Sequence, residues 1–348
     1  MDRGKQVGRI VHFYRARYKV FHLSLAAQDD TASGIFVGEL QNRSPNGLLL
    51  PGNPYFPKPF IFHKKTEGMS MTNQPDNTAL RTALWRALHV FDDDEPHIIE
   101  DTVGYELIEP GEDWKERPDM KYTKRLRASI VARARFVEDL AKEEIAKGVK
   151  QYVLLGAGLD SFAQRNTGIS SQIDIYEIDQ PDTLTWKEEK LVQHGYPLPS
   201  TLHFVPVDFE RYSWWEELLK RGFNPAMTAF VSCTGVTLYL TKDAITDTLK
   251  KMTLLAPDST IAIAFYLPLE ELDEEDRPLL EMSIKGAAVS GTPFRSFCTK
   301  EEIERLAKEV GLKNIETVAT KEMRDRYFKN RTDGLVPASG EFFLIAKT

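Results

Sequence analysis

The sequence predicts an α/β fold built around a doubly wound, parallel β-sheet. From residue 148 onward, short runs of β-branched and aliphatic residues alternate with helical stretches, which is typical of a sheet with helices on both faces. The first predicted strand runs directly into the loop Gly156-Ala157-Gly158, and the second ends in acidic residues. Because open sheets of this kind bind ligands at the carboxyl ends of their strands, these two segments mark the expected site.

The composition is that of a globular protein of enzyme size. The chain has 348 residues, of which 42% are hydrophobic and 28% charged, so there is enough apolar surface to offset chain entropy and disorder throughout is excluded. A net charge of −7 argues against nucleic acid as a partner. The two cysteines, Cys233 and Cys298, form no disulfide framework and predict a reducing compartment, the cytoplasm. No membrane association is predicted, because the longest apolar run, residues 260–269, is too short to span a bilayer.

Residues 1–70 differ from the remainder of the chain. They contain ten Lys and Arg against five acids, carry five prolines, and show no sustained helical or strand period. We therefore predict a basic, poorly ordered extension over residues 1–70 and a working domain over residues 71–348. The alternative for the Arg-rich, acid-poor first 28 residues is an organelle transit peptide.

Two long helices are predicted to open the working domain. Residues 78–88 contain no Pro or Gly and place apolar residues at helical spacing, and residues 119–147 do so again, with Gly148 as the C-cap. The basic part of the second helix, residues 121–135, resembles a nucleic-acid patch in charge only. It lacks interleaved aromatic residues and belongs to an acidic domain, so no nucleic-acid partner is predicted.

Seven strands and their intervening helices follow. Strands are predicted at residues 152–155, 173–178, 203–207, 229–232, 260–266, 315–319 and 341–347. Helices are predicted around residues 188–191, 214–219, 241–255 and 300–310, with Thr241 as an N-cap. The acidic run over residues 270–276 is expected to be a solvated helix start, and by position residues 268–296 are a candidate lid over the substrate.

The glycine loop and the strand-end acids predict a nucleoside site. Gly156 and Gly158 allow backbone N–H groups to approach a ligand at a helix N-terminus, although a tight turn alone would need them too. Glu177 follows Gly156 by 21 residues, the spacing at which an acid reaches a ribose hydroxyl. Asp208 and Phe209 end the third strand, where the acid can accept from an adenine amino group and the ring can pack on the base.

Both dinucleotides and S-adenosylmethionine bind such loops. Asp160 and Ser161 follow the loop, where an acid is a poor neighbour for a pyrophosphate, and no Tyr-x-x-x-Lys occurs in the chain. S-adenosylmethionine carries a sulfonium and an ammonium, so an acidic pocket suits it better. NAD(P) nevertheless stays open on these residues alone.

Three motifs in order resemble those of the leucine carboxyl methyltransferase family, and most closely its microbial branch of S-adenosylmethionine-dependent O-methyltransferases. The motifs are residues 155–160 (LGAGLD), residues 176–181 (YEIDQP) with Lys187 behind them, and residues 234–241 (TGVTLYLT). The resemblance covers about residue 73 to the C-terminus. It implies a class I methyltransferase fold, which is a Rossmann-like, mostly parallel sheet with an antiparallel last strand and an N-terminal helical cap.

The resemblance also implies roles for particular residues toward S-adenosylmethionine as cofactor. Arg86 and Arg133 would hold its methionine carboxylate, Gly156 would line the methionine moiety, and Asp179 would bind the ribose. Asp208 and Phe209 would lie at the adenine end. Where the family usually has Glu before the Gly-Val of the third motif, this chain has Thr234, which can accept a hydrogen bond but brings no charge.

The predicted reaction is methyl transfer to an oxygen, most simply to a carboxylate of a small molecule or a peptide terminus. A carboxylate has a reference pKa near 4 and needs no strong base, so catalysis is expected to come from positioning. Tyr239 is the one candidate catalytic side chain. No zinc motif, Gly-x-Ser-x-Gly elbow or phosphate-binding Gly-Lys loop occurs, and no metal site is predicted. The alternatives are an NAD(P)-dependent oxidoreductase and a non-catalytic nucleoside-binding module.

Overall fold

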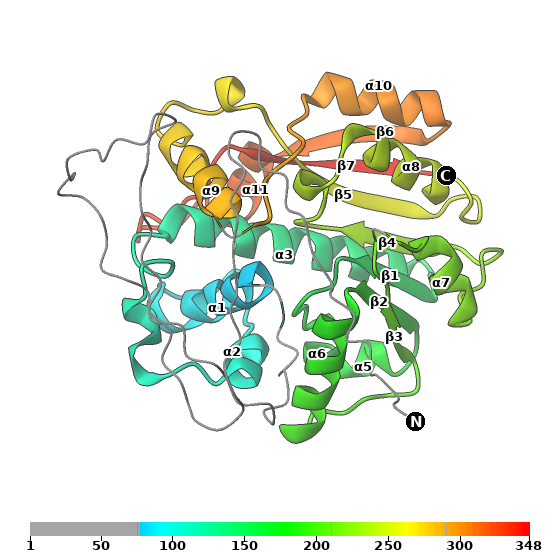
Figure 1. Cartoon of the computed structure of the whole chain (residues 1–348), viewed down its shortest axis with the longest axis horizontal. Helices are drawn as coiled ribbons and strands as arrows, with labels where there is room; N and C mark the ends of the chain where they lie inside the picture. Colours follow the sequence, from blue (N-terminus) through cyan, green and yellow to red (C-terminus); the bar gives the residue numbers. More distant parts are fainter. Residues whose placement is uncertain (1–74, 76, 210, 290) are drawn as a thin grey trace, which may run out of the picture. The chain divides into compact units, whose positions relative to one another are not determined.

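A seven-stranded sheet forms the centre of the computed structural model, which describes residue 75 and residues 77–209, 211–289 and 291–348 (Figure 1). The predicted extension over residues 1–70 lies outside the described residues. The strand order is β3-β2-β1-β4-β5-β7-β6. In chain order the strands are β1 (Gln151–Leu155), β2 (Asp174–Asp179), β3 (Leu202–Pro206), β4 (Ala229–Cys233), β5 (Thr260–Tyr266), β6 (Lys313–Ala319) and β7 (Glu341–Lys347).

The directions of the strands agree with the prediction of a mostly parallel sheet with an antiparallel last strand. Strands β1 to β5 pair in parallel, whereas β7 runs antiparallel to both β5 and β6. The chain builds outward from β1 through β2 to β3 and then returns to lay β4 on the other side of β1. The strand order therefore reverses between β1 and β4, which is the place where open α/β sheets bind ligands.

Helices cover both faces of the sheet, as near-continuous apolar strands require. On β1, Val153 and Leu155 join one core cluster, whereas Tyr152 and Leu154 join the other. The first cluster is closed by α7 (Trp214–Lys220), α8 (Lys242–Met252) and α10 (Lys300–Val310), and the second by α3 (Lys124–Ala146), α4 (Phe162–Arg165) and α11 (Thr320–Tyr327). Figure 1 shows α3 on one side of the sheet and α8 and α10 on the other.

The predicted N-terminal helical cap is formed by α1 (Asn77–Asp92) and α2 (Val103–Ile108). Helix α1 packs on α3, and α2 packs on α6 (Pro181–Gln193). The remaining elements are α5 (Thr167–Ser170), α9 (Arg277–Val289) and three short 3-10 helices, η1 (Glu112–Glu116), η2 (Thr237–Tyr239) and η3 (Leu269–Glu271). None of the described helices is both long and apolar enough to cross a membrane.

The helix ends follow their capping residues. Helix α10 has the predicted bounds, and Thr299 and Glu302 form a reciprocal capping box at its start. Thr241 caps α8 as predicted and accepts from the backbone N–H of Ala244 at 3.2 Å. Helix α3 begins at Lys124, five residues later than predicted, because Tyr122 takes a positive φ of 56° and turns the chain before the helix.

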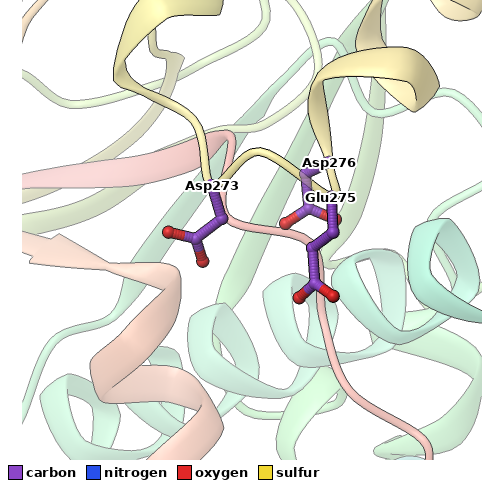
Figure 2. Close-up of side chains that lie close together, drawn as sticks. All are labelled: Asp273, Glu275 and Asp276. Carbon is purple, nitrogen blue, oxygen red and sulfur yellow. The ribbon is translucent and has the colours of Figure 1, made fainter.

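The acidic run over residues 270–276 is not a solvated helix start throughout. Helix α9 begins only after it, at Arg277. Asp276 is 1% exposed, and Arg125 of α3 donates from Nε and Nη2 to its two carboxylate oxygens at 2.7 and 2.8 Å. Asp273 and Glu275 lie beside it and are exposed (Figure 2). This ion pair, buried on the side of Asp276, ties the start of α9 to α3.

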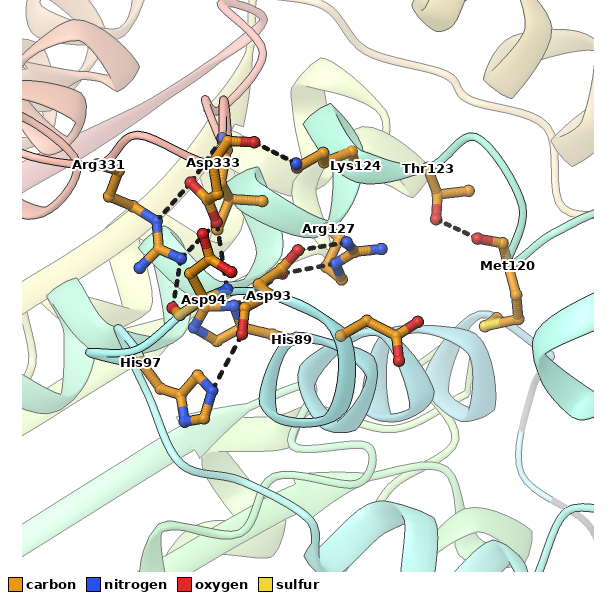
Figure 3. Close-up of polar contacts among 12 residues, drawn as sticks. His89, Asp93, Asp94, His97, Met120, Thr123, Lys124, Arg127, Arg331 and Asp333 are labelled. Atoms are coloured by element: carbon orange, nitrogen blue, oxygen red, sulfur yellow. Dashed lines mark hydrogen bonds and ion pairs between the residues drawn. The ribbon is translucent and has the colours of Figure 1, made fainter.

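A buried polar network joins α1 to α3 (Figure 3). The carboxylate of Asp93 accepts from Nε and Nη2 of Arg127, and from Nδ1 of His89 at 2.9 Å. Because the other ring nitrogen of His89 accepts from the backbone N–H of Ile98 at 2.9 Å, the neutral tautomer with a proton on Nδ1 satisfies both contacts. His89 is fully buried, and burial lowers its pKa below the ordinary value of 6.5, despite the opposing effect of Asp93.

We expect this histidine to make the protein less stable as the pH falls below 6.5. The unfolded chain then takes up a proton that the folded chain does not, so the free energy of unfolding falls by up to about 1.4 kcal/mol per pH unit per group until the lower folded pKa is reached. Urea unfolding of the wild type and His89→Gln at pH 7.5, 6.5 and 5.5 measures the slope. In the variant, the free energy of unfolding should depend less steeply on pH, by up to the contribution of one proton. An equal pH dependence in the two proteins would contradict the assignment.

Candidate active site

A cavity of about 620 Å³ lies at the carboxyl ends of β1, β2 and β4. Its lining comes from the segments that follow these strands, from Phe209 after β3, from the cap helix α1 and α3, and from residues 291–295 after α9. Of the predicted cofactor residues, the cavity brings together Arg86, Arg133, Gly156, Gly158, Asp179, Phe209 and Thr234, together with Tyr239. Glu177 and Asp208 do not line it.

The glycine loop is shaped by close packing and by its contacts with β2. Gly156 has a φ of +72°, and a Cβ on it would lie 2.1 Å from Cγ2 of Val236, so only glycine fits there. The N–H groups of Gly156 and Ala157 both donate to the carbonyl of Ile178. The amides of Gly156 and Ala157 are therefore engaged by β2, and that of Gly158 is engaged by Asp179, so contact of this loop with a ligand stays a prediction. Gly156 lets the loop pass close to Val236.

Asp179 holds the second half of this loop. Its Oδ2 accepts from the N–H of Gly158 at 2.7 Å, and its Oδ1 accepts from the N–H of Gln180 at the same distance. The register of the sheet pairs Leu155, the last residue of β1, with Ile178, so Asp179 projects one residue beyond β1. It therefore lies beside the glycine loop and at the cavity.

Glu177 lies two residues earlier and has a different environment. It is fully buried between β1 and β3, where Leu154 and Phe204 are its register partners. Nζ of Lys187, from α6, donates to its Oε2 at 2.5 Å. Burial raises the pKa of Glu177, and Lys187 opposes that shift. The predicted contact with a ribose is not supported by this geometry, because the carboxylate is inside the sheet and engaged by a lysine.

Asp208 also stays outside the cavity, while its neighbour Phe209 lines it. Nε of Arg211 lies 3.3 Å from Oδ2 of Asp208. Phe209 packs against the core cluster that includes Val205 and Val207, so its ring presents one surface to the core and one to the cavity. Of the predicted adenine pair, the aromatic residue is the one placed to contact a base.

Two arginines reach the cavity from the cap helix and α3. Arg86 donates from Nε to Asp101 and from Nη2 to the carbonyl of Leu159, both at 2.6 Å. Arg133 donates from Nη1 to the hydroxyl of Tyr266 at 2.8 Å and to Glu341 at 3.0 Å. Burial opposes its charge, but Glu341 raises the pKa of Arg133 above its ordinary value.

Gly235 faces the guanidinium of Arg133. A Cβ at this position would lie 3.4 Å from Nη2 of Arg133, and the φ of Gly235 is +70°. Glycine therefore lets the guanidinium approach the turn after β4. Nη1 serves Tyr266 and Glu341, and Arg133 also lines the cavity.

The sequence did not reveal a cluster of polar residues that lines the cavity and includes Asp101 and Arg165. Asp101 is 1% exposed, and it accepts from Arg86 and from the hydroxyl of Ser161 at 2.6 Å. Burial alone would raise the pKa of Asp101, but the charges of Arg86 and Arg165 hold it below its ordinary value. Arg165 also pairs with Glu138 at 2.6 Å. No spacing in the sequence links residues 101, 138 and 161, since tertiary packing alone brings them together.

We expect Asp179→Ala to weaken binding of S-adenosylhomocysteine by about 1.5–3 kcal/mol, the usual contribution of a hydrogen bond to a charged group. The loss combines the predicted ribose contact with the anchoring of the glycine loop. Calorimetric titration measures it, and Asp182→Ala, which changes an exposed acid in the first turn of α6, is the matched control. A change smaller than twofold would place the ribose elsewhere.

Thr234→Glu is expected to strengthen binding of S-adenosylmethionine more than that of S-adenosylhomocysteine. Both ligands carry the ammonium, whereas the sulfonium charge is present in the first alone. At an effective dielectric near 20, a unit pair about 5 Å apart contributes roughly 3 kcal/mol before desolvation, and burial of the new carboxylate offsets part of it. We expect a selectivity of about tenfold at most in paired titrations. Equal changes for both ligands would place residue 234 away from the sulfonium.

The sequence profile of the leucine carboxyl methyltransferase family matches residues 79–253. A Bacillus subtilis protein named "Putative S-adenosyl-L-methionine-dependent methyltransferase YktD" is 34% identical over 206 residues, which are 59% of this chain and 67% of that protein. A Mycolicibacterium smegmatis protein with a similar name is 34% identical over 149 residues, covering 42% of this chain and 48% of its own length. The matches thus span about two thirds of the first relative and about half of the second.

One solved structure supports the fold. A DUF574 family protein from Streptomyces avermitilis superposes with a TM-score of 0.50 at 14% identity, over 79% of this chain and 98% of that one. At this identity the likeness concerns the fold alone.

Proposed function

The chain belongs to the leucine carboxyl methyltransferase family and is an S-adenosyl-L-methionine-dependent methyltransferase, and on this premise we propose that its methyl acceptor is a carboxylate oxygen of a small molecule or a peptide terminus. The family decides against the NAD(P)-dependent oxidoreductase and the non-catalytic module that the sequence left open. The cofactor, when bound, supplies an electrophilic methyl group on sulfur, and the acceptor oxygen forms the new C–O bond while sulfur keeps the electron pair of the broken C–S bond.

The residues at the cavity fit this cofactor. Gly156 and Arg133 both line the cavity, and Arg133, whose Nη1 already serves Tyr266 and Glu341, would donate to a methionine carboxylate through Nη2. An ionised carboxylate has about four acceptor positions, so Asp179 can hold the glycine loop and accept from a ribose hydroxyl. Phe209 offers a ring surface to adenine.

The observation that carries the carboxylate proposal is the lack of an effective base. Among the described residues that line the cavity there is no histidine, lysine or cysteine. The pKa values of Asp101 and Glu138 are held below their ordinary values against the effect of burial, that of Asp101 by Arg86 and Arg165 and that of Glu138 by Arg165 and Lys142. Such carboxylates are weak bases at neutral pH. Burial raises the pKa of Tyr152 well above its ordinary value, so this phenol stays protonated.

An acceptor that is already ionised needs no base. A carboxylate is deprotonated at neutral pH, so the chain's own residues have only to align it with the methyl group and exclude water. Alignment of this kind can lower a barrier by roughly 7–11 kcal/mol. Tyr239 lines the cavity after β4 and stays a candidate for positioning the acceptor.

The test is methyl transfer from methyl-labelled cofactor to a panel of organic acids and peptides with free C-termini, with the matching amides and with phenols as controls. We expect label in the acids, released as methanol by mild alkali, because methyl esters hydrolyse under these conditions and methyl ethers do not. Label that appears in phenols or amines and resists alkali would contradict the proposal.

A further inference from the structure

Arg295 stands at the cavity on the segment that follows α9, and no role has been given to it so far. We propose that Arg295 binds the carboxylate of the methyl acceptor, while Tyr239, whose ring packs edge to face on Phe294, contacts the apolar body next to that carboxylate. The inference rests on the proposed function, since it names the residues that recognise the acceptor. It predicts an acceptor with an aromatic or aliphatic group beside its carboxylate.

The arginines at the cavity differ in whether their charge is paired. Four described arginines line it. Arg86 is paired with Asp101, Arg133 with Glu341, and Arg165 with Glu138, at 2.6, 3.0 and 2.6 Å. The side chain of Arg295 makes no hydrogen bond or ion pair with any residue that the structure describes. It is therefore the arginine at the cavity whose charge is left for an anionic ligand.

The backbone at Arg295 is held in place by hydrogen bonds. Its N–H donates to the carbonyl of Leu238 at 2.6 Å, and the hydroxyl of Ser296 donates to the carbonyl of Leu240, also at 2.6 Å. The N–H of Cys298 donates to the carbonyl of Tyr266 at the end of β5. The segment is thus fastened to η2 and to the sheet, so the arginine is presented from a fixed position beside the cavity.

An aromatic cluster is formed by Tyr239 of η2 and by residues on either side of Arg295 in the sequence. Phe294 and Tyr239 meet edge to face, with ring centroids 5.6 Å apart and planes at 71°. Phe297 continues the cluster at 6.3 Å from Phe294. Tyr239 lines the cavity together with Arg295. A cation next to aromatic rings suits an acid whose charged end is attached to an apolar body.

These contacts refine the prediction of a lid over residues 268–296. Among the described residues of that region, those that line the cavity are Gly291, Thr292, Pro293 and Arg295. Helix α9 itself does not line it. The recognition element is therefore the short segment after α9. The carboxylate of the acceptor has about four acceptor positions. When the guanidinium of Arg295 occupies those on one edge, the remaining lone pairs are available to attack the methyl group.

The test is equilibrium binding to the full chain saturated with S-adenosylhomocysteine, followed by ligand-observed NMR. The probes are 3-phenylpropionate, octanoate and a tripeptide with a free C-terminal phenylalanine, each compared with its primary amide. The proteins are the wild type, Arg295→Gln, Arg295→Lys and the control Arg305→Gln, which removes an exposed arginine of α10 that does not line the cavity. Equal affinity for S-adenosylhomocysteine in all four establishes that each is folded.

We expect the wild type and Arg305→Gln to bind an acid about fivefold more tightly than its amide, as for a partly exposed ion pair. Arg295→Gln should abolish this preference and Arg295→Lys should keep part of it. Preference for the free acids or for the peptide identifies the source of the carboxylate, and either supports the proposal. An unchanged preference in Arg295→Gln overturns it, as does failure of every acid to bind the wild type. Because no methyl group is transferred in this experiment, the two failures are distinguishable: Arg295-dependent binding without carboxyl methylation would overturn the proposed function and leave Arg295 as a carboxylate-binding residue.

Discussion

Replacing Arg133 by glutamine is expected to lower the free energy of unfolding by about 3–5 kcal/mol, the cost of leaving a buried charge without its partner. The side chains of Arg133 and Glu341 are 11% and 6% exposed, and the N–O distance between them is 3.0 Å. Without the guanidinium, Glu341 keeps a buried carboxylate that water cannot solvate. Chemical denaturation with two independent probes measures the change.

A double variant separates this structural effect from cofactor binding. Arg133→Gln with Glu341→Gln removes both charges, so we expect most of the stability to return while binding of S-adenosylhomocysteine stays at least tenfold weaker, as for a lost charged hydrogen bond worth about 1.5–3 kcal/mol. Arg135→Gln is the control, because its side chain is 43% exposed and pairs with Asp139 on the surface, where such pairs contribute about 0–1 kcal/mol. Wild-type affinity in the double variant would make Arg133 a purely structural residue.

Lys187→Met is expected to destabilise the fold by a similar amount, about 3–5 kcal/mol. Lys187 and Glu177 are both fully buried, and Lys187 is the cation that Oε2 of Glu177 contacts. Oε1 of Glu177 has no hydrogen-bond partner among the described residues, so the loss of Lys187 leaves the carboxyl group without a compensating contact. Thermal and urea unfolding should both report the loss.

The partner substitution also tests the role of Glu177. Glu177→Leu with Lys187→Met replaces the pair by apolar groups, which is often neutral or stabilising, so stability should approach that of the wild type. Because Glu177 lies outside the cavity, we expect the affinity for S-adenosylhomocysteine to change less than twofold in this double variant. A tenfold loss of affinity for S-adenosylhomocysteine in a folded double variant would instead indicate that Glu177 contacts the ribose.

The sheet was predictable because its signals are local. Short apolar runs alternate with helices, and this alternation allows one arrangement with both faces covered. The order of elements and the ends of α10 and β5 follow from it. Short helices such as α2 and α11 were missed, because they pack through tertiary contacts and carry weak periodicity of their own.

Glu177 and Asp179 show where prediction of the site ends. Both are acids at the end of one strand, and two residues apart they share a face of the sheet. What separates them is the register with β1, which ends opposite Ile178. Glu177 is therefore covered by neighbouring strands, while Asp179 projects past them. Spacing along the sequence cannot supply a register, so it pointed to Glu177, whereas Asp179 was indicated by the family resemblance alone.

The ion pairs around the cavity depend on contacts between distant segments. Arg133 pairs with Glu341, which lies 208 residues later in the sequence. The position of Arg295 likewise depends on the hydrogen bond from its N–H to the carbonyl of Leu238 in η2. Each residue alone has the appearance of an ordinary surface charge in the sequence. Their roles become visible only in the folded chain, where β7 and the segment after α9 lie close to the place at which the strand order of the sheet reverses.

The account depends most on the claim that this cavity holds the cofactor. A crystal structure of the full chain with S-adenosylhomocysteine tests it directly. We predict the ligand in the cavity at the ends of β1, β2 and β4, with its amino-acid carboxylate at Arg133, its ribose at Asp179 and its adenine on Phe209. Electron density for the ligand at any other place, or in this cavity with no contact to Asp179 and Arg133, would contradict the account.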